Sequence, residues 1–364
     1  MQPQFSIIVP CCGVEPYAEE MIASVKAQGG EWECLLVVEE SLDDTLDTLK
    51  RLTDDDARFR LFTQKRSGSP AAPRNTGLEH ASGDFVIFLD GDDWLAEGAL
   101  VRLAERIAQH PGGDIYPCAL REWQEDEAGN RQQAGFYDNF SNISALEWAG
   151  CDALLDFDRH NFIPLALAQL LVCRRSFLNA NKLRFMHGLV HEEEEFFPRA
   201  FYYASKVVPL HEVIYEYRHH PHAITTAPDA AKRELDSVAT ILRSLFRFHA
   251  KVSREPDFDV KLTDCWRRRW FGVLARKICD AKVGENFPPE HRLNLLRSIF
   301  SDGFHDLRRL VHGSSFMPHL AAALLKLGVR TGWLKAVELF ARIVEGGVCE
   351  AGASSDAGGM ERRI

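Results

Sequence analysis

Long hydrophobic runs are missing from this sequence. No uncharged apolar stretch reaches the roughly 18–20 residues that span a bilayer, and no basic region followed by an apolar one opens the chain as in a secretory signal. The nine cysteines form no Cys-x-x-Cys pair and have no His-x₃₋₅-His partner, which excludes the common zinc frameworks and favours reduced thiols. The sequence therefore predicts a cytoplasmic protein, with peripheral contact at the inner face of the cell membrane left open.

Basic charge is also in deficit. Lys and Arg number 43 against 53 Asp and Glu, which gives a net charge of −10. Because there is no long basic run either, we expect no general binding of nucleic acid. A hydrophobic content of 46% and a charged content of 26% are those of a globular protein, and 364 residues suffice for two or three structural units.

Glycine-rich phosphate loops are absent too. No Gly-x-Gly-x-x-Gly follows the first predicted strand, and no Gly-x₄-Gly-Lys-Ser/Thr occurs. A standard dinucleotide site and a P-loop are therefore not supported. A nucleotidyltransferase that makes activated sugars would need a basic, glycine-rich loop after the first strand. Residues 10–15 read Pro-Cys-Cys-Gly-Val-Glu instead, which disfavours that class.

What the sequence does have is a buried strand that ends in acids. Residues 85–89 are apolar and aromatic, and Asp90, Asp92 and Asp93 follow within four positions. Gly91 can take backbone angles that most residues cannot. Carboxylate oxygens are the preferred ligands of Mg²⁺ or Mn²⁺, which keep coordination positions for phosphates. The plain alternative is a solvated Asp-Gly turn.

Strands and helices alternate up to this point. Strands are expected at 5–10, 33–38, 58–62 and 85–89, and helices at 15–28, 45–52 and 74–81. This order predicts an α/β fold with a doubly wound, mostly parallel sheet flanked by helices. Ligands bind beyond the carboxyl ends of such strands. We therefore expect Pro10, the pair Glu39-Glu40 and the stretch Asp90-Gly91-Asp92 to converge in one crevice.

Five segments in the first hundred residues resemble family 2 glycosyltransferases of the GT-A fold, in order and in spacing. Together they span about a quarter of the chain. The segments are Ser6-Ile7-Ile8-Val9-Pro10 with Val14-Glu15-Pro16-Tyr17, Val38-Glu39-Glu40 with Asp44, Ala72-Pro73-Arg74-Asn75-Thr76-Gly77-Leu78, Ala81-Ser82-Gly83-Asp84, and Asp90-Gly91-Asp92-Asp93.

This resemblance implies a nucleotide-diphosphate sugar donor, a UDP-sugar foremost, and a glycan or lipid-linked acceptor. It implies a Mn²⁺ or Mg²⁺ ion on the Asp-x-Asp motif, with Asp92 as the direct ligand and Asp90 nearer the ribose or a metal-bound water. The residues implied in nucleotide contacts are Pro10, Glu15, Glu39, Glu40, Arg74, Asp90 and Gly91.

Two motifs depart from the family pattern. Cys12-Gly13 stands where the family has Tyr-Asn, and Glu39-Glu40-Ser41-Leu42 stands where it has Asp-Asp-Gly-Ser. Glu keeps the charge of Asp but adds a methylene, so the contact with the base or the ribose must be rebuilt. The donor stays open for this reason. So does a second hypothesis, a catalytically inactive glycosyltransferase-like module that binds a nucleotide or a partner.

A second acidic stretch occurs at 192–195, where four glutamates follow an apolar lead-in. Acids at a helix N-terminus offset the macrodipole, which is a sufficient structural reason for them. The stretch also resembles the family's His-Glu-Asp-x-x-Phe segment, which implies that Glu193 is the general base, with Glu192 as its neighbour. An inverting transfer needs such a carboxylate, because the acceptor hydroxyl does not lose its proton near pH 7 unaided. The leaving diphosphate needs no proton if a metal neutralises it.

Residues 213–225 resemble the family's Leu-Tyr-x-Tyr-Arg…Ser-Ile-Thr segment. Arg218 with the nearby histidines forms a cationic, donor-rich patch. We predict that Arg218 contacts the diphosphate and that His220 supplies a metal ligand. A plain solvated loop is the alternative.

The sequence predicts four parts in this chain. A helix is expected at 95–112, at the end of the first part. The parts are a nucleotide-sugar-binding half at 1–112, an acceptor-side half at 113–228, a helical C-terminal domain at 229–345 and a disordered tail at 346–364.

Overall fold

The computed structural model describes residues 3–126, 128–138, 140, 147–159, 166–220, 230–263 and 265–266. The chain forms two compact units, Met1–Ser237 and Val238–Ile364. Both sheets belong to the first unit. The tail predicted at 346–364 lies outside the described residues, and the predicted four-part division stays a prediction.

The larger sheet has six strands in the order β3-β2-β1-β4-β9-β6. The parallel pairs β3–β2, β2–β1 and β1–β4 form its first part, whereas β9 is antiparallel to both β4 and β6. The mostly parallel α/β sheet predicted from the sequence is thus confirmed. The strands are β1 (Phe5–Cys11), β2 (Trp32–Glu39), β3 (Phe59–Gln64), β4 (Phe85–Phe88), β6 (Ile115–Pro117) and β9 (Leu171–Arg174).

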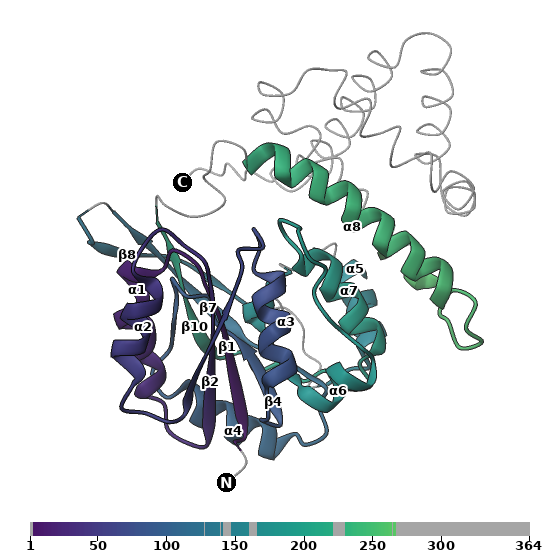
Figure 1. Cartoon of the computed structure of the whole chain (residues 1–364). Coiled ribbons are helices and arrows are strands. Elements are labelled where there is room, and N and C mark those ends of the chain that lie inside the picture. The colour runs from purple at the N-terminus through teal and green to yellow at the C-terminus, as the bar shows by residue number, and fades with distance from the viewer. Residues whose placement is uncertain are drawn as a thin grey trace, which may run out of the picture. The chain divides into compact units, whose positions relative to one another are not determined.

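Helices cover both faces of this sheet because strand side chains alternate between faces. Ile7 and Val9 pack in one core with Met21 of α1. Ile8 points the other way, towards Gly77 of α3, where an added Cβ would lie 2.3 Å from its Cγ2 atom. Gly77 therefore lets α3 approach β1 closely. Figure 1 shows α1 and α2 next to each other. The helices are α1 (Glu15–Lys26), α2 (Thr45–Thr53), α3 (Ala71–His80) and α4 (Ala99–Gln109).

A smaller sheet has four strands in the order β5-β10-β7-β8. In it β10 runs parallel to β7 and antiparallel to β5, and β7 and β8 form an antiparallel hairpin. The helix expected at 95–112 is shorter than predicted, because Leu95 pairs with Tyr215 in β5 and the helix begins only at Ala99. The strands are β5 (Trp94–Leu95), β7 (Ala119–Glu125), β8 (Arg131–Tyr137) and β10 (Val213–His219).

The remaining described elements are short helices and one long one. In the first unit they are α5 (Gly150–Arg159), the 3₁₀ turn η1 (Ala168–Leu170), α6 (Arg175–Ala180) and α7 (Glu193–Tyr203). Helix α8 (Ala230–Val252) begins before the second unit and ends within it. In the second unit, the rings of Phe248, His249 and Phe258 lie near the Trp266 ring. None of the helices in the described ranges combines the length and hydropathy that a bilayer crossing requires.

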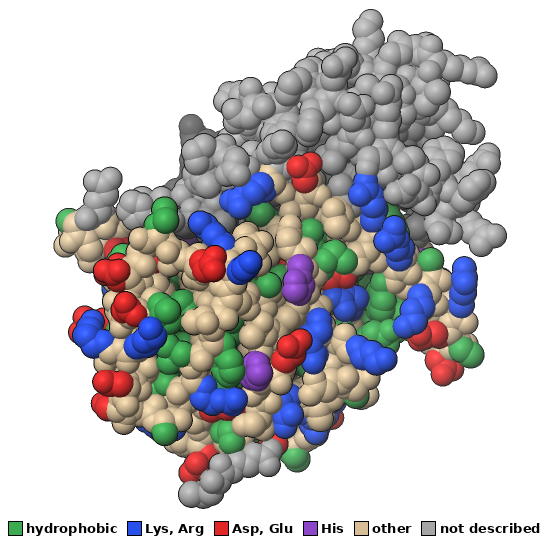
Figure 2. Space-filling model, in the orientation of Figure 1, with side chains coloured by type: hydrophobic (Ala, Val, Ile, Leu, Met, Phe, Trp, Pro, Cys, Tyr) green, Lys and Arg blue, Asp and Glu red, His purple; other side chains and the backbone are tan. Residues whose placement is uncertain are grey.

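On the described part of the face in Figure 2, Lys and Arg side chains are scattered together with Asp and Glu side chains. The cysteines in the described residues are all free thiols, as the sequence predicts.

Candidate functional site

The site is built at the edge where β1, β2 and β4 end. Gly91 lies against the end of β1, since a Cβ on it would be 3.1 Å from the Pro10 carbonyl oxygen and 3.0 Å from Val14 Cγ1. A larger residue would push the turn of residues 90–93 outwards. The structure therefore brings Pro10 and the acidic turn together, as the strand order predicts.

The acids that follow β2 lie at the same edge. Glu39 is buried, and its Oε1 atom accepts hydrogen bonds from Gln64 Nε2 at 2.9 Å and from the Ser67 amide at 3.2 Å. Glu40 is exposed. Glu15 Oε2 accepts from the Asp44 amide at 3.2 Å, which ties the start of α1 to the loop after β2. Their nucleotide contacts stay predictions.

Both carboxylate oxygens and the amide of Asp90 form hydrogen bonds with other residues of the protein. Its Oδ1 atom accepts from Arg74 Nη2 at 2.7 Å, and its Oδ2 atom accepts from Gln169 Nε2. Its amide donates to the Tyr215 hydroxyl at 3.1 Å. With both carboxylate oxygens occupied, Asp90 is positioned as a fixed negative charge.

Asp92 is more open, with a side chain that is 34% exposed. His220 Nε2 lies 3.0 Å from Asp92 Oδ2, and His220 Nδ1 lies 2.8 Å from the Tyr17 hydroxyl. Among the described residues Asp92 Oδ1 has no hydrogen-bond partner, which leaves it available to a cation.

The third acid of the turn, Asp93, is buried and structural. It accepts hydrogen bonds from the Tyr215 hydroxyl at 2.5 Å and from the Arg218 amide at 2.7 Å. Burial raises the pKa of Asp93, and the charges of Asp92 and Asp90 raise it further. Negative charge is therefore crowded at this turn.

The segment predicted to carry the general base, residues 192–195, lies next to the acidic turn through Arg74. Arg74 Nη1 donates to Glu192 Oε1 at 2.6 Å, and both side chains are only 2% exposed. Arg74 lies over the Phe185 ring at 5.4 Å, and that ring stacks on Phe196 of α7 at 4.3 Å. His191 turns the chain into α7 with a φ of 63°, a left-handed conformation that is uncommon outside glycine.

Glu193 is the first residue of α7 and is partly exposed. Burial raises the pKa of both Glu192 and Glu193, while the Arg74 cation opposes the rise. The charge of Glu193 raises the pKa of Glu192 further. A carboxylate with a raised pKa accepts a proton more readily, which is the property that a general base needs.

Arg218, predicted to contact a diphosphate, is buried among protein partners. Its Nε atom donates to the Asp92 carbonyl oxygen at 2.7 Å, Nη2 donates to Glu20 at 2.6 Å, and Nη1 donates to Glu125. The predicted diphosphate contact stays a prediction.

A divalent cation fits the charge of this edge. Asp90 and Glu192 pair with Arg74, and the charge of Glu193 lies near it, so three acids face one buried cation. Arg218 and Arg131 are balanced by Glu20 and Glu125. No group of three or more potential metal ligands is preassembled in the described part of the chain. Asp92, with His220 beside it, would thus hold a cation whose remaining ligands come from phosphates and water.

Three residues that contact the acidic turn or its partners were not predicted from the sequence to do so. Tyr17 and Tyr215 lie within segments that resemble the family, but nothing in the pattern assigned them to the acidic turn. Gln169 lies in the short turn η1, and its buried Oε1 atom has no hydrogen-bond partner within the described ranges. No local signal marked it.

Comparisons with known proteins bear on the fold and on the family that the sequence resembles. The mixed sheet flanked by helices is that of the GT-A fold. Residues 6–161, less than half of the chain, match the family model described as glycosyl transferase family 2.

Two curated relatives and one solved structure illustrate the likeness. The uncharacterised glycosyltransferase EpsJ of Bacillus subtilis is 31% identical over 229 residues, covering 63% of this chain and 64% of EpsJ. A Campylobacter jejuni protein named GalNAc(5)-diNAcBac-PP-undecaprenol β-1,3-glucosyltransferase is 37% identical over 106 residues, covering 29% of this chain and 34% of its own length. The chain thus spans less than two thirds of either relative.

The fold is shared with Staphylococcus aureus TarS. The structure of TarS residues 1–349 with UDP-GlcNAc aligns with a TM-score of 0.55 at 20% identity, covering 81% of this chain and 87% of that one.

Proposed function

We propose that this protein is an inverting glycosyltransferase that moves a sugar from a nucleotide-diphosphate donor to a hydroxyl of a glycan or lipid-linked acceptor. One observation carries the proposal. The buried Arg74 guanidinium pairs with Asp90 at 2.7 Å and with Glu192 at 2.6 Å, which joins the donor turn to the base segment. A donor held at the turn would have a carboxylate close by to activate an acceptor.

On the donor side, Asp92 would hold Mn²⁺ or Mg²⁺, with His220 as a neighbouring ligand. When bound, that ion neutralises the charge that develops on the leaving diphosphate. Asp90 keeps its orientation through Arg74 and Gln169 and presents a fixed charge to the ribose or to a metal-bound water. Glu39, Glu40, Glu15 and Pro10 would line the nucleoside end.

On the acceptor side, Glu193 is the base that we favour over Glu192. The Glu192 carboxylate is occupied by Arg74 and is 2% exposed, whereas Glu193 is partly exposed at the helix start. Glu193 takes the proton of the acceptor hydroxyl as its oxygen attacks the anomeric carbon. The bond from that carbon to the phosphate oxygen breaks, the diphosphate leaves with the electron pair, and the configuration inverts.

The names of similar proteins support the choice of substrates. TarS has been solved with UDP-GlcNAc, and the Campylobacter jejuni relative is named for an undecaprenol-linked glycan. We therefore place UDP-sugars first among donors, and a lipid-linked or growing glycan first among acceptors. A lipid-linked acceptor would bring the protein to the inner face of the membrane peripherally.

A thermal-shift screen of nucleotide sugars with Mn²⁺ and with a chelator tests the donor and the metal together. A ligand that binds only the native state raises the melting temperature according to its concentration over its dissociation constant. We expect one UDP-sugar to stabilise the wild type with Mn²⁺ and not with chelator. Asp92→Asn should lose that stabilisation, and Asp55→Asn, which changes an exposed surface pair, should keep it.

Release of nucleoside diphosphate then separates an enzyme from a binding module. An enzyme consumes the stabilising donor and releases diphosphate, more slowly in Glu193→Gln. A module with metal-dependent binding but no release would support the inactive alternative. Unchanged binding and transfer in Asp92→Asn would refute the proposed metal site.

A further inference from the structure

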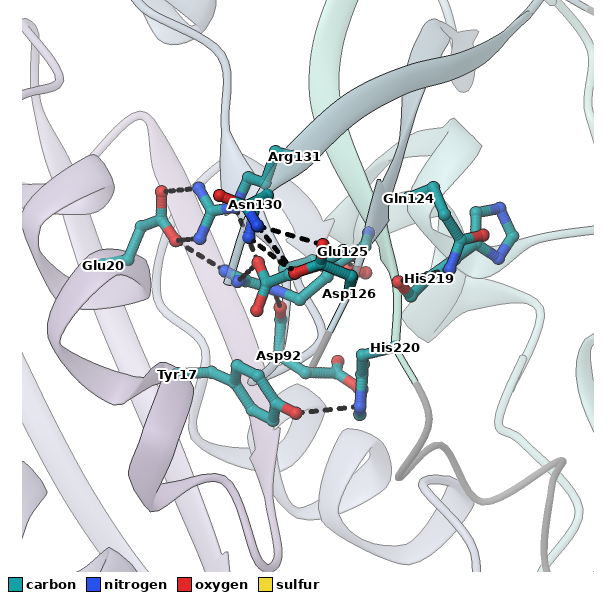
Figure 3. A network of polar contacts seen from close by, with 12 residues as sticks. Tyr17, Glu20, Asp92, Gln124, Glu125, Asp126, Asn130, Arg131, His219 and His220 are labelled. Atoms are coloured by element: carbon teal, nitrogen blue, oxygen red, sulfur yellow. Dashed lines mark hydrogen bonds and ion pairs between the residues drawn. The ribbon is translucent and has the colours of Figure 1, made fainter. Parts of the chain in front are cut away.

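Four charged side chains form a closed cluster beside the acidic turn, and we name it the clamp: Glu20 of α1, Glu125 of β7, Arg131 of β8 and Arg218 of β10. Glu20 accepts from Arg131 Nη1 at 2.5 Å and from Arg218 Nη2 at 2.6 Å. Glu125 accepts from Arg131 Nε at 2.6 Å and from Arg218 Nη1. Figure 3 shows Glu20 pointing from α1 towards Arg131 at the start of β8.

Arg218 is the buried member of the clamp and the one that touches the acidic turn. Its Nε atom donates to the Asp92 carbonyl oxygen at 2.7 Å, and its amide donates to Asp93 Oδ1 at 2.7 Å. Its guanidinium lies 4.8 Å from the centre of the Tyr17 ring and 4.9 Å from that of Trp94. All three guanidinium nitrogens are therefore engaged, and two aromatic rings lie near the group.

His220 holds the same aspartate from two residues further along. Arg218 lies near the end of β10 and His220 directly follows that strand, and both side chains reach Asp92. Arg218 takes the carbonyl of Asp92, while His220 Nε2 lies 3.0 Å from its carboxylate. Tyr17 contacts both, since its hydroxyl lies 2.8 Å from His220 Nδ1 and its ring lies beside the Arg218 guanidinium. Figure 3 shows Tyr17, Asp92 and His220 close together, with a dashed line from Tyr17 to His220.

We propose that Arg218 is a positioning residue for Asp92, with Glu20, Glu125 and Arg131 as the groups that fix its guanidinium. This inference rests on the function proposed above, in which Asp92 holds the cation. It replaces the direct diphosphate contact predicted from the sequence. Two arginines meet two glutamates in the clamp, so Arg218 has no unbalanced charge to offer a phosphate.

The geometry of arginine is what the position requires. A planar guanidinium donates in three directions at once, here to a carbonyl oxygen and two carboxylates. Lysine keeps the charge but is a point donor on a flexible stem, so it cannot hold all three partners in this arrangement. Arg218→Lys thus separates charge from positioning.

The first test measures amide hydrogen exchange of residues 90–94 in the protein without metal or nucleotide. Arg218→Lys should speed exchange of this segment on the order of tenfold, the effect of losing one hydrogen bond to a charged group. Glu20→Gln should speed it less, because Glu125 still fixes Arg218. Lys26→Gln is the matched control, because Lys26 lies on α1 like Glu20 and the change breaks only its surface pair with Asp55. It should leave exchange unchanged.

The second test titrates Mn²⁺ at a fixed concentration of UDP. We expect the half-saturating Mn²⁺ concentration to rise on the order of tenfold in Arg218→Lys, with UDP affinity near that of the wild type once Mn²⁺ is saturating. Lys26→Gln should match the wild type.

Each outcome has a distinct meaning. Unchanged exchange at 90–94 in Arg218→Lys, with weaker UDP binding at saturating Mn²⁺, would overturn positioning in favour of a direct phosphate contact. If Arg218→Lys does not fold, Glu20→Gln decides, because the Glu20 side chain is 36% exposed and Glu125 still pairs with the buried Arg218. Unchanged exchange in a folded Glu20→Gln would reject the clamp. Failure of the proposed function would appear in the wild type as no Mn²⁺-dependent UDP binding, while the exchange comparison still judges the clamp.

Discussion

Removing the Arg74 side chain should destabilise the protein in a pH-dependent way. Arg74 is 2% exposed and pairs with Glu192, also 2% exposed, and with Asp90. In Arg74→Met both acids lose this cation, although Asp90 keeps the Gln169 donor. Leaving a buried charge without its partner typically costs about 3–5 kcal/mol. We expect a loss of this size in the free energy of unfolding at about pH 8, where the carboxyls ionise on unfolding.

The sign of the pH dependence follows from the raised pKa values. Burial already raises the pKa of Glu192 and Glu193 above the ordinary value of 4.5, and Arg74 opposes that rise. The charge of Glu193 adds to the rise for Glu192, and the charge of Asp90 adds to it for both. Without Arg74 the folded-state pKa values rise further above the unfolded ones. The folded variant therefore binds protons more tightly than the unfolded chain, so its deficit is largest at high pH and shrinks as the pH falls. Each proton changes stability by at most about 1.4 kcal/mol per pH unit.

Urea unfolding followed by tryptophan fluorescence at about pH 8 and about pH 5 measures this difference. Arg175→Met is the matched control, because Arg175 donates to the carbonyl oxygens of Gly83 and Ser82 and leaves no buried acid behind. Its deficit should be the same at both pH values. An Arg74→Met deficit that is equally large at both would show that Glu192 and Glu193 are not held ionised by Arg74.

Three further changes probe the reacting side. Glu193→Gln should lower turnover about 10²- to 10⁴-fold, while its affinity for the donor stays that of the wild type. A pH–rate profile of the wild type should show the rate falling on acidification at a higher pH than expected for an ordinary glutamate with a pKa of 4.5, because the pKa of Glu193 is raised. Gly91→Ala, whose Cβ would lie 3.1 Å from the Pro10 carbonyl oxygen, should raise the Mn²⁺ concentration needed for donor binding; an unchanged titration would mean that the turn can move freely. Gln169→Leu should weaken donor binding by releasing Asp90 Oδ2, measured by calorimetry, and unaltered affinity would argue that Arg74 alone positions Asp90.

The fold was predictable from sequence because its signals are local. Apolar runs of strand length, each stopped by acids or proline, fixed β1, β2 and β4, and the crossover rule placed their carboxyl ends at one edge. The convergence of Pro10, Glu39 and the acidic turn follows from that. Element ends were less certain, as the helix expected from residue 95 shows. Leu95 is apolar at helical spacing, but it pairs with Tyr215 in a strand 120 residues further on, which no local pattern reveals.

The partners of the site residues were not predictable for the same reason. Glu20 and Arg131 are 111 residues apart, and Gln169 reaches Asp90 across 79. The sequence predicted that Arg218 is free to bind an anion, because its neighbours in sequence are histidines. Its counter-charges come instead from α1 and β7. Sequence identifies which residues carry charge, but only the fold decides whether that charge is already neutralised.

That distinction separates the two buried arginines that contact the acidic turn. Arg74 and Arg218 are both nearly inaccessible, and each contacts one aspartate of the Asp-x-Asp motif. Arg218 is balanced by Glu20 and Glu125 and meets Asp92 through a neutral carbonyl, so it fixes position without changing the charge of the site. Arg74 meets Asp90, Glu192 and the nearby charge of Glu193, which outnumber it. The excess of negative charge therefore lies between the donor turn and α7. A divalent cation and the positive charge that develops on a transferred sugar would both be stabilised there.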